Sequence, residues 1–305
     1  MQAPMRTLRP LGYGGLLDQT FELYRENFLL FAGITGVVYV PLALLQVALV
    51  PQSFTGFPLP PGPEDMPTPP PELGGVLLYG FIAMLLGIFV PGVVTKAIAD
   101  RYLNQPASIG ASYGYIFRRF FPYLWTWIVV VFVVSVIVIG FSLLLGLLSA
   151  AVPLAAPLLI ALAGILIVWV MLRCSLVGQV FVVEQLAGMR AVNRSWQLAG
   201  GYAFRIFVAF VLLYILILVL SVALSMGLGT VAAISQASPM RFLVGFMQGV
   251  LQMLLAPIPL ILLTLLYFDL RVRKEAFDLQ LLAQSLAVPL EVPEAGEEEQ
   301  VRSDE

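Results

Sequence analysis

Six charged residues lie within ten positions near the end of this otherwise apolar chain. They are Asp269, Arg271, Arg273, Lys274, Glu275 and Asp278. On a helix, the i, i+4 spacing forms three pairs of opposite charge: Asp269 with Arg273, Arg271 with Glu275, and Lys274 with Asp278. Each exposed pair stabilises a helix by only about 0.2 to 0.5 kcal/mol. The pattern therefore indicates an anchor or a docking surface rather than a catalytic group.

An apolar stripe accompanies these charges. Leu270, Phe277 and Leu281 lie close in angle on the same helix, and full burial of a large apolar side chain stabilises by about 1.5 to 3 kcal/mol. We expect the stripe to pack on the helical bundle or to lie in the headgroup layer. The charges are then expected to face water and anionic lipid, as an anchor or as a docking surface for a partner.

Few residues are suited to catalysis or metal binding. The chain has no histidine and one cysteine, Cys174, so it lacks His-based triads, His-ligated zinc and the usual base for a thiol nucleophile. Carboxylates for acid–base work would have to come from Asp18, Glu22, Asp100, Glu184 and Asp269. All of them fall near the ends of apolar runs, where acids are ordinarily solvated or paired with arginine. No catalytic residue, cofactor, metal or nucleic-acid partner is predicted.

Arg173 and Glu184 allow two interpretations. They are 11 residues apart and share a face of a continuous helix, with Arg173 about 16 Å deeper along the axis. If Glu184 marks the membrane surface, Arg173 lies near the bilayer centre, where charged residues are functional by default. If residues 154 to 172 already span the membrane, Arg173 extends only to the inner surface.

The elements that position these residues are long apolar helices. Apolar residues make up 60% of the 305 positions and charged residues 11%, which is typical of an all-α integral membrane protein. A span needs roughly 20 apolar residues. Six stretches qualify: 28–50, 73–95, 122–148, 154–182, 206–230 and 242–268.

Basic residues predict the orientation of these spans, because cytoplasmic loops retain Lys and Arg. With six spans, 14 of the 16 basic residues fall on one side, and both termini are then expected in the cytoplasm of a prokaryotic inner membrane. Residues 51–72 form a proline-rich outer loop, and residues 283–305 an acidic disordered tail. The inward basic face is expected to attract anionic membrane lipids.

A weak threefold repeat is visible in the same sequence. A short segment with a hydroxyl residue followed by an aromatic one precedes the first, third and fifth spans: Thr20-Phe21, Ser112-Tyr113 and Ser195-Trp196. The pattern suggests three units, near 1–98, 99–183 and 184–270. Each would consist of an interfacial amphipathic helix and a helical hairpin.

Three segments resemble the glycerophosphoryl diester phosphodiesterase membrane domain family. They are "LRPLGYGGLLDQTFELYRENF" at 8–28, "VVEQLAGMRAVNRSWQLAGGYAFR" at 182–205 and "LTLLYFDLRVRKEAFDL" at 263–279. The resemblance implies a prokaryotic multi-span membrane domain, which some members join to a catalytic domain. Here only 36 residues follow position 269, and histidine, which the phosphodiesterase chemistry uses, is missing. The resemblance supplies no catalytic residue.

Two functional hypotheses remain. The first is a non-catalytic membrane domain that organises a partner protein or lipid at the cytoplasmic face, based on the inward basic residues and the missing catalytic groups. The alternative is a transporter or permease component, because Pro91-Gly92, Pro257 and Pro259 interrupt the second and sixth spans and Arg173 lies within a long apolar run. Discontinuous helices bind substrates in transporters.

Overall fold

A computed structural model describes residues 12–49, 73–234 and 238–275. Within these ranges the chain is helical and contains no strand. Its elements are α1 (Tyr13–Glu26), α2 (Phe28–Leu49), α3 (Leu73–Tyr102), α4 (Ile109–Arg118), α5 (Phe120–Ala151), a 3₁₀ turn η2 (Pro153–Ala155), α6 (Ala156–Cys174), α7 (Val177–Glu184), α8 (Met189–Ala199), α9 (Ala203–Ile234), α10 (Ser238–Leu255) and α11 (Pro257–Glu275). The proline-rich loop and the acidic tail lie outside the described residues.

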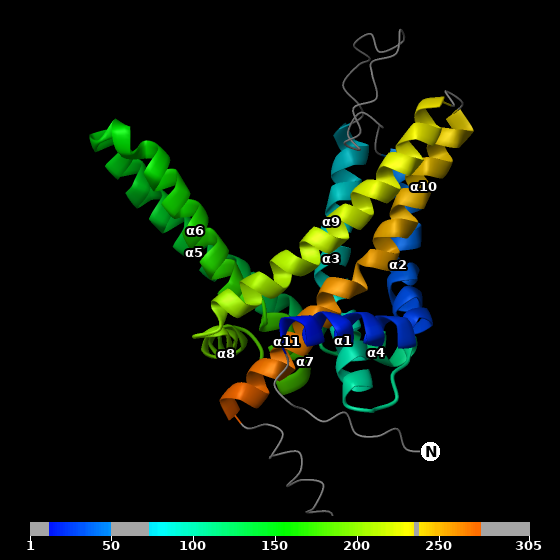
Figure 1. Cartoon of the computed structure of the whole chain (residues 1–305), viewed down its shortest axis with the longest axis horizontal. Coiled ribbons are helices and arrows are strands. Elements are labelled where there is room, and N and C mark those ends of the chain that lie inside the picture. Colours follow the sequence, from blue (N-terminus) through cyan, green and yellow to red (C-terminus); the bar gives the residue numbers. More distant parts are fainter. Residues whose placement is uncertain (1–11, 50–72, 235–237, 276–305) are drawn as a thin grey trace, which may run out of the picture.

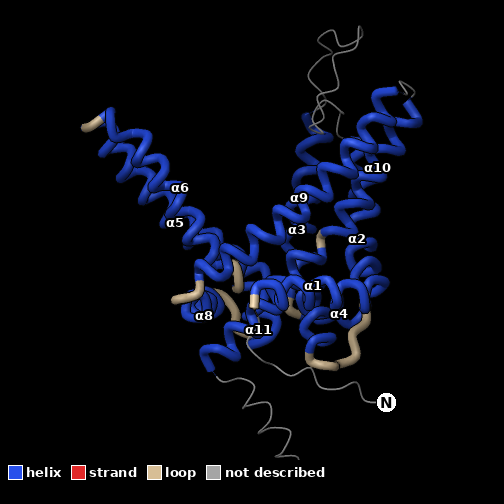
Figure 2. Tube along the Cα trace, viewed as in Figure 1, coloured by secondary structure: helices blue, strands red, loops and turns tan. Residues whose placement is uncertain are grey.

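Six helical stretches are long and apolar enough to cross a membrane. They are Phe28–Gln46, Gly74–Tyr102, Phe120–Ser149, Ala156–Glu184, Ala203–Leu224 and Leu243–Glu275. The predicted all-α membrane fold with six spans is therefore confirmed. The molecule is V-shaped: the α5–α6 hairpin leans away from α2, α3, α9 and α10, and both arms meet in a base that contains α1, α4, α7, α8 and α11 (Figure 1). Figure 2 shows only short connections between these helices in the base.

The span predicted over 154–182 is present as Ala156–Glu184, but it is not one continuous helix. The stretch divides into α6 and α7, with Ser175 and Leu176 between them. No proline causes this break. At the end of α6, Ser195 of α8 donates its hydroxyl to the carbonyl of Arg173 at 2.6 Å. This hydrogen bond gives a partner to one of the last carbonyls of α6, which lack partners within the helix.

The predicted sixth helix over 242–268 is also divided. It breaks at Ala256 into α10 and α11. Proline lacks an N–H group and its ring collides with the preceding turn, so Pro257 begins a helix more readily than it continues one. The second helix of the first hairpin, α3, carries Pro91 internally without ending.

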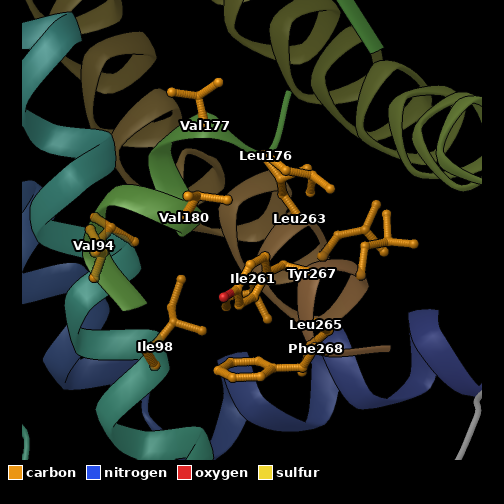
Figure 3. Packing of buried hydrophobic residues seen from close by; sticks show 14 of the residues in the cluster. Val94, Ile98, Leu176, Val177, Val180, Ile261, Leu263, Leu265, Tyr267 and Phe268 are labelled. Atoms are coloured by element: carbon orange, nitrogen blue, oxygen red, sulfur yellow. The ribbon is translucent and has the colours of Figure 1, made fainter. Parts of the chain in front are cut away.

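The protein core lies on the carboxyl-terminal side of these two breaks and of Pro91 in α3. Residues 93–102 of α3, helix α7, and residues 258–272 of α11 supply most of its fully buried side chains. We call these stretches the three core segments. The packed sets come from all three, with Val94 and Ile98 meeting Val180 and Ile261 (Figure 3). The parts of the hairpins that extend away from the base instead expose apolar side chains along their length, as expected for helices that face lipid.

The helix order agrees with the predicted threefold repeat. A short helix precedes each hairpin: α1 before α2 and α3, α4 before α5 and α6, and α8 before α9 and α10. Thr20, Ser112 and Ser195, the three hydroxyl residues matched in sequence, are 0%, 1% and 0% exposed. Each of the three faces inward from its short helix. The three residues that match in sequence are therefore also alike in burial.

The three units also interlock in one direction. The core segment of each unit packs on the short helix of the next: α3 contacts α4, α7 contacts α8, and α11 returns to contact α1. Each core segment carries an acid within its last four residues, Asp100, Glu184 or Asp269, which we call its terminal acid. Five residues before each terminal acid is a buried polar residue: Thr95, Gln179 or Thr264. These acids provide a common register for comparing the three junctions.

Candidate functional site

The base of the molecule carries an excess of positive charge. Of the basic residues whose side chains the structure describes, all twelve lie in the short helices or at the base ends of the long ones, together with seven acids: Asp18, Glu22, Glu26, Asp100, Glu184, Asp269 and Glu275. Arg241 lies at the start of α10, at the far end of the bundle (Figure 1). The structure thus gathers at one end of the molecule eleven of the 14 basic residues that the sequence analysis placed on the cytoplasmic side. The other three, Arg6, Arg9 and Arg302, lie outside the described residues.

Glu184 is at the centre of a closed network at the α7–α8 junction. One carboxylate oxygen accepts from Arg194 Nε at 2.7 Å and the other accepts from the Tyr267 hydroxyl at 2.8 Å. Arg194 also reaches Glu275 at 2.5 Å, and Glu275 accepts from Arg271 Nε at 3.3 Å. Burial by itself would lower the pKa of Arg194, but its bonds to Glu184 and Glu275 outweigh burial and raise that pKa. The network ties α7, α8 and α11 together and leaves no carboxylate in it free.

Asp269 forms a second buried ion cluster. Its Oδ2 lies 3.0 Å from Arg273 Nε on the same helix and 3.0 Å from both Nε and NH2 of Arg205, at the start of α9. Asp269 is 4% exposed. The expected Asp269–Arg273 and Arg271–Glu275 pairs are therefore confirmed, whereas the expectation that the charges of this segment face water was wrong for Asp269. Asp278, Phe277 and Leu281 lie outside the described residues.

Arg173 and Lys274 stabilise the carboxyl end of α8. Arg173 donates to the Trp196 carbonyl at 3.0 Å, and the Lys274 ammonium donates to the Gln197 carbonyl. Cations favour a helix C-terminus, where the last carbonyls lack partners. The Arg173 guanidinium also lies 4.9 Å from the Trp169 ring centroid. These contacts favour the interpretation in which Arg173 lies at the base surface.

A basic pocket opens at the α3–α4 junction. Its volume is about 630 Å³, and its lining comprises Lys96, Asp100, Gln105, Pro106, Gly110, Ala111, Gly114, Tyr115, Arg118 and Arg119. Lys96 binds Asp100 at 2.6 Å. Lys96 Nζ and the Arg119 guanidinium each lie 5.0 Å from the centroid of the Tyr115 ring. The sequence analysis counted Lys96, Arg118 and Arg119 only as inward basic residues and Asp100 only as a carboxylate near a span end, because nothing in the sequence shows that α3 and α4 leave a pocket between them.

Tyr115 and Arg119 link this pocket to α7. The Tyr115 hydroxyl donates to the Val182 carbonyl at 3.0 Å, and Arg119 donates to the side chain of Gln185 at 2.8 Å. Burial raises the pKa of the Tyr115 phenol, so its hydroxyl stays protonated as this donor. Gln185 ends α7 in a left-handed conformation, with φ of 59°.

Two carboxylates that the sequence analysis considered, Asp18 and Glu22, are exposed on α1 and are not part of either ion cluster. No group of three His, Cys, Asp or Glu side chains able to hold a metal ion occurs within residues 12–49, 73–234 and 238–275. Among the proposed site residues, the structure brings Glu184, Arg271 and Glu275 into one network and Asp269 and Arg273 into another.

No protein-family model matches the chain, and no curated protein or solved structure is significantly similar to it. Membership of the glycerophosphoryl diester phosphodiesterase membrane domain family therefore stays a prediction based on the three quoted segments. The conclusion about structure is nevertheless firm: the chain is a multi-pass, all-α membrane-type protein with a charged base and apolar arms.

Proposed function

We propose that this chain is a non-catalytic membrane domain that organises anionic lipid at its basic face. The observation that carries the proposal is the division of charge in the base. Its four buried or half-buried acids, Asp100, Glu184, Asp269 and Glu275, are bound to arginine or lysine. Arginines such as Arg118 and Arg190 have no carboxylate partner within the described part of the chain and are exposed.

Exposed aromatic residues beside these cations support a membrane-surface location for the base. Phe117, Phe121 and Trp125 are 78%, 80% and 59% exposed at the junction of α4 and α5. Aromatic rings concentrate at the membrane interface, and anionic headgroups attract nearby Lys and Arg. A lipid-facing role uses both kinds of residue, which is why we favour it over a protein partner.

The transporter alternative is less well supported, because the segments after the helix interruptions are closed. Val94, Val180 and Ile261, one from each core segment, are 0% exposed. At Pro91-Gly92, the space beside Gly92 is filled by the Tyr123 ring, whose hydroxyl donates to the Ile88 carbonyl at 2.8 Å. Helix α3 is continuous here, and the small Gly92 serves helix packing.

Reconstitution separates these functions. The purified full chain, placed in vesicles of mixed phosphatidylglycerol and phosphatidylcholine, should enrich phosphatidylglycerol in the lipid that it retains on extraction. Saturable solute uptake that Arg173→Ala abolishes would overturn the proposal in favour of transport. A protein that co-purifies stoichiometrically from native membranes, with no lipid preference, would indicate partner docking instead.

A further inference from the structure

We infer that the pocket at the α3–α4 junction is a binding site for the phosphate group of an anionic membrane lipid. The inference deepens the proposed function, on which it rests, by assigning lipid recognition to one place. It does so through Lys96, Arg118 and Arg119, which line the pocket together with a single acid, Asp100. The lining therefore has two more positive than negative side chains, as a phosphate-bearing ligand requires.

The internal repeat shows that the fold does not require these cations. Counted from the terminal acid of each core segment, the position of Lys96 is occupied by Val180 in α7 and Leu265 in α11. Counted from the inward hydroxyl of each short helix, the positions of Arg118 and Arg119 are occupied by other residue types. They are Gly201 and Tyr202 after α8, and Glu26 and Asn27 after α1. Lysine or arginine therefore occupies these three aligned positions only at the α3–α4 junction, among the junctions that the structure describes.

The shape of α4 keeps the site open. Gly110 and Gly114 line the pocket, and a Cβ added to either glycine would meet no atom within 4 Å. Ala111, between them, is the third small residue of this face. These three small residues leave the cations accessible to an entering group. No neighbouring atom of the described residues lies close enough to Gly110 or Gly114 for helix packing to require a glycine at either position.

The position of the pocket fits a lipid source for the phosphate. Arg118 and Arg119 directly follow Phe117, and Phe121 comes two residues later, so the basic wall continues into an exposed aromatic surface. A headgroup in the pocket could leave its acyl chains along this aromatic surface. Lys96 is held by Asp100 at 2.6 Å and by the Tyr115 ring, which places a charged donor in the pocket wall before any ligand enters.

The test uses steric and charge variants of the full chain in neutral detergent, titrated with short-chain phosphatidylglycerol at about 0.15 M salt and followed by native mass spectrometry. Gly114→Leu fills the pocket without changing charge, and Gly14→Leu, at an equally open glycine of α1, is its control. We expect Gly114→Leu to weaken binding at least about tenfold and Gly14→Leu by less than about twofold. Matched thermal unfolding of the two variants checks that both are folded.

Charge variants provide a second comparison. Arg118→Gln should weaken phosphatidylglycerol binding about tenfold, since it removes one charged donor from the site. Arg190→Gln removes an equally exposed arginine from α8 and should have a clearly smaller effect. Equal losses in the two variants would show diffuse attraction by the basic face and would overturn the site.

Two further outcomes identify which proposal fails. Wild-type affinity in Gly114→Leu overturns the site but leaves the proposed function intact, whereas no preference of the wild-type chain for phosphatidylglycerol over phosphatidylcholine overturns the proposed function itself. Inorganic phosphate is the remaining arm. If it binds the wild-type pocket as tightly as phosphatidylglycerol and is lost in Gly114→Leu, the pocket takes free phosphate and the lipid source is wrong.

Discussion

The α3–α4 and α7–α8 junctions occupy equivalent places in the repeat, yet they use charge in opposite ways. At α7–α8, Glu184 and Glu275 bind Arg194, and Tyr267 and Arg271 complete the network. At α3–α4, Asp100 binds Lys96 alone, and Arg118 is exposed beside an open pocket. The same architecture therefore uses its cations for cohesion at one junction and leaves Arg118 exposed beside a pocket at the other, where we propose that a ligand binds.

The largest effect should come from neutralising the terminal acids at the two junctions. Glu184→Gln should destabilise by about 3 kcal/mol, because two arginines in contact with it lose a partly buried counter-charge. Asp100→Asn should cost about 1 kcal/mol, since Asp100 has one cation partner among the described residues, Lys96, whereas Glu184 has two. Thermal unfolding of both variants in the same detergent measures the difference. Equal destabilisation would mean that the two junctions are held together in the same way.

The next effect concerns backbone space beside the helix interruptions. A Cβ at Gly92 would lie 2.8 Å from the Tyr123 ring, whereas a Cβ at Gly178 in α7 meets nothing within 4 Å. Gly92→Ala should therefore cost about 1 to 3 kcal/mol by overpacking. Gly178→Ala should be neutral or stabilise by up to about 1 kcal/mol through helix propensity. If Gly92→Ala is as stable as wild type, the closed packing assigned to Gly92 is wrong.

A smaller effect should distinguish the equivalent serines. Ser195→Ala removes the hydroxyl bonded to the Arg173 carbonyl at the α6–α7 break and should cost about 1 kcal/mol. Ser112→Ala should cost less, because the Ser108 carbonyl that it bonds also accepts from the backbone N–H of Ser112. Chemical unfolding followed by tryptophan fluorescence gives both values. A larger loss for Ser112→Ala would contradict the role assigned to Ser195.

Sequence patterns predicted most of the helices, because apolar runs of span length are strong signals. They also located the amphipathic helices α1, α4 and α8 through Thr20, Ser112 and Ser195, since a small polar residue can face a tightly packed interior and bond a backbone carbonyl. The Asp269–Arg273 and Arg271–Glu275 pairs of α11 could also be predicted from sequence, because an i, i+4 pair depends only on helix geometry.

The remaining features depend on contacts between distant parts of the chain. The break after Cys174 coincides with a hydrogen bond from Ser195 of α8, and no proline or glycine stands at the break. The burial of Asp269 depends on Arg205, 64 positions away. The pocket combines Lys96 of α3 with Arg118 of α4. In the sequence, these two residues do not differ from the other basic residues predicted on the cytoplasmic side. Charge counting predicted which face they occupy but not which of them are left without a partner.

The most direct test of the contrast between junctions measures two properties of two arginine variants. Arg118→Gln should unfold at the wild-type temperature and bind short-chain phosphatidylglycerol about tenfold more weakly. Arg194→Gln should lose about 2 to 3 kcal/mol of stability, because Glu184 and Glu275 lose a shared partner, while its folded fraction binds the lipid as the wild type does. If Arg118→Gln is the destabilised variant, or Arg194→Gln is the one that loses lipid, the assignment of cohesion to one junction and recognition to the other is contradicted.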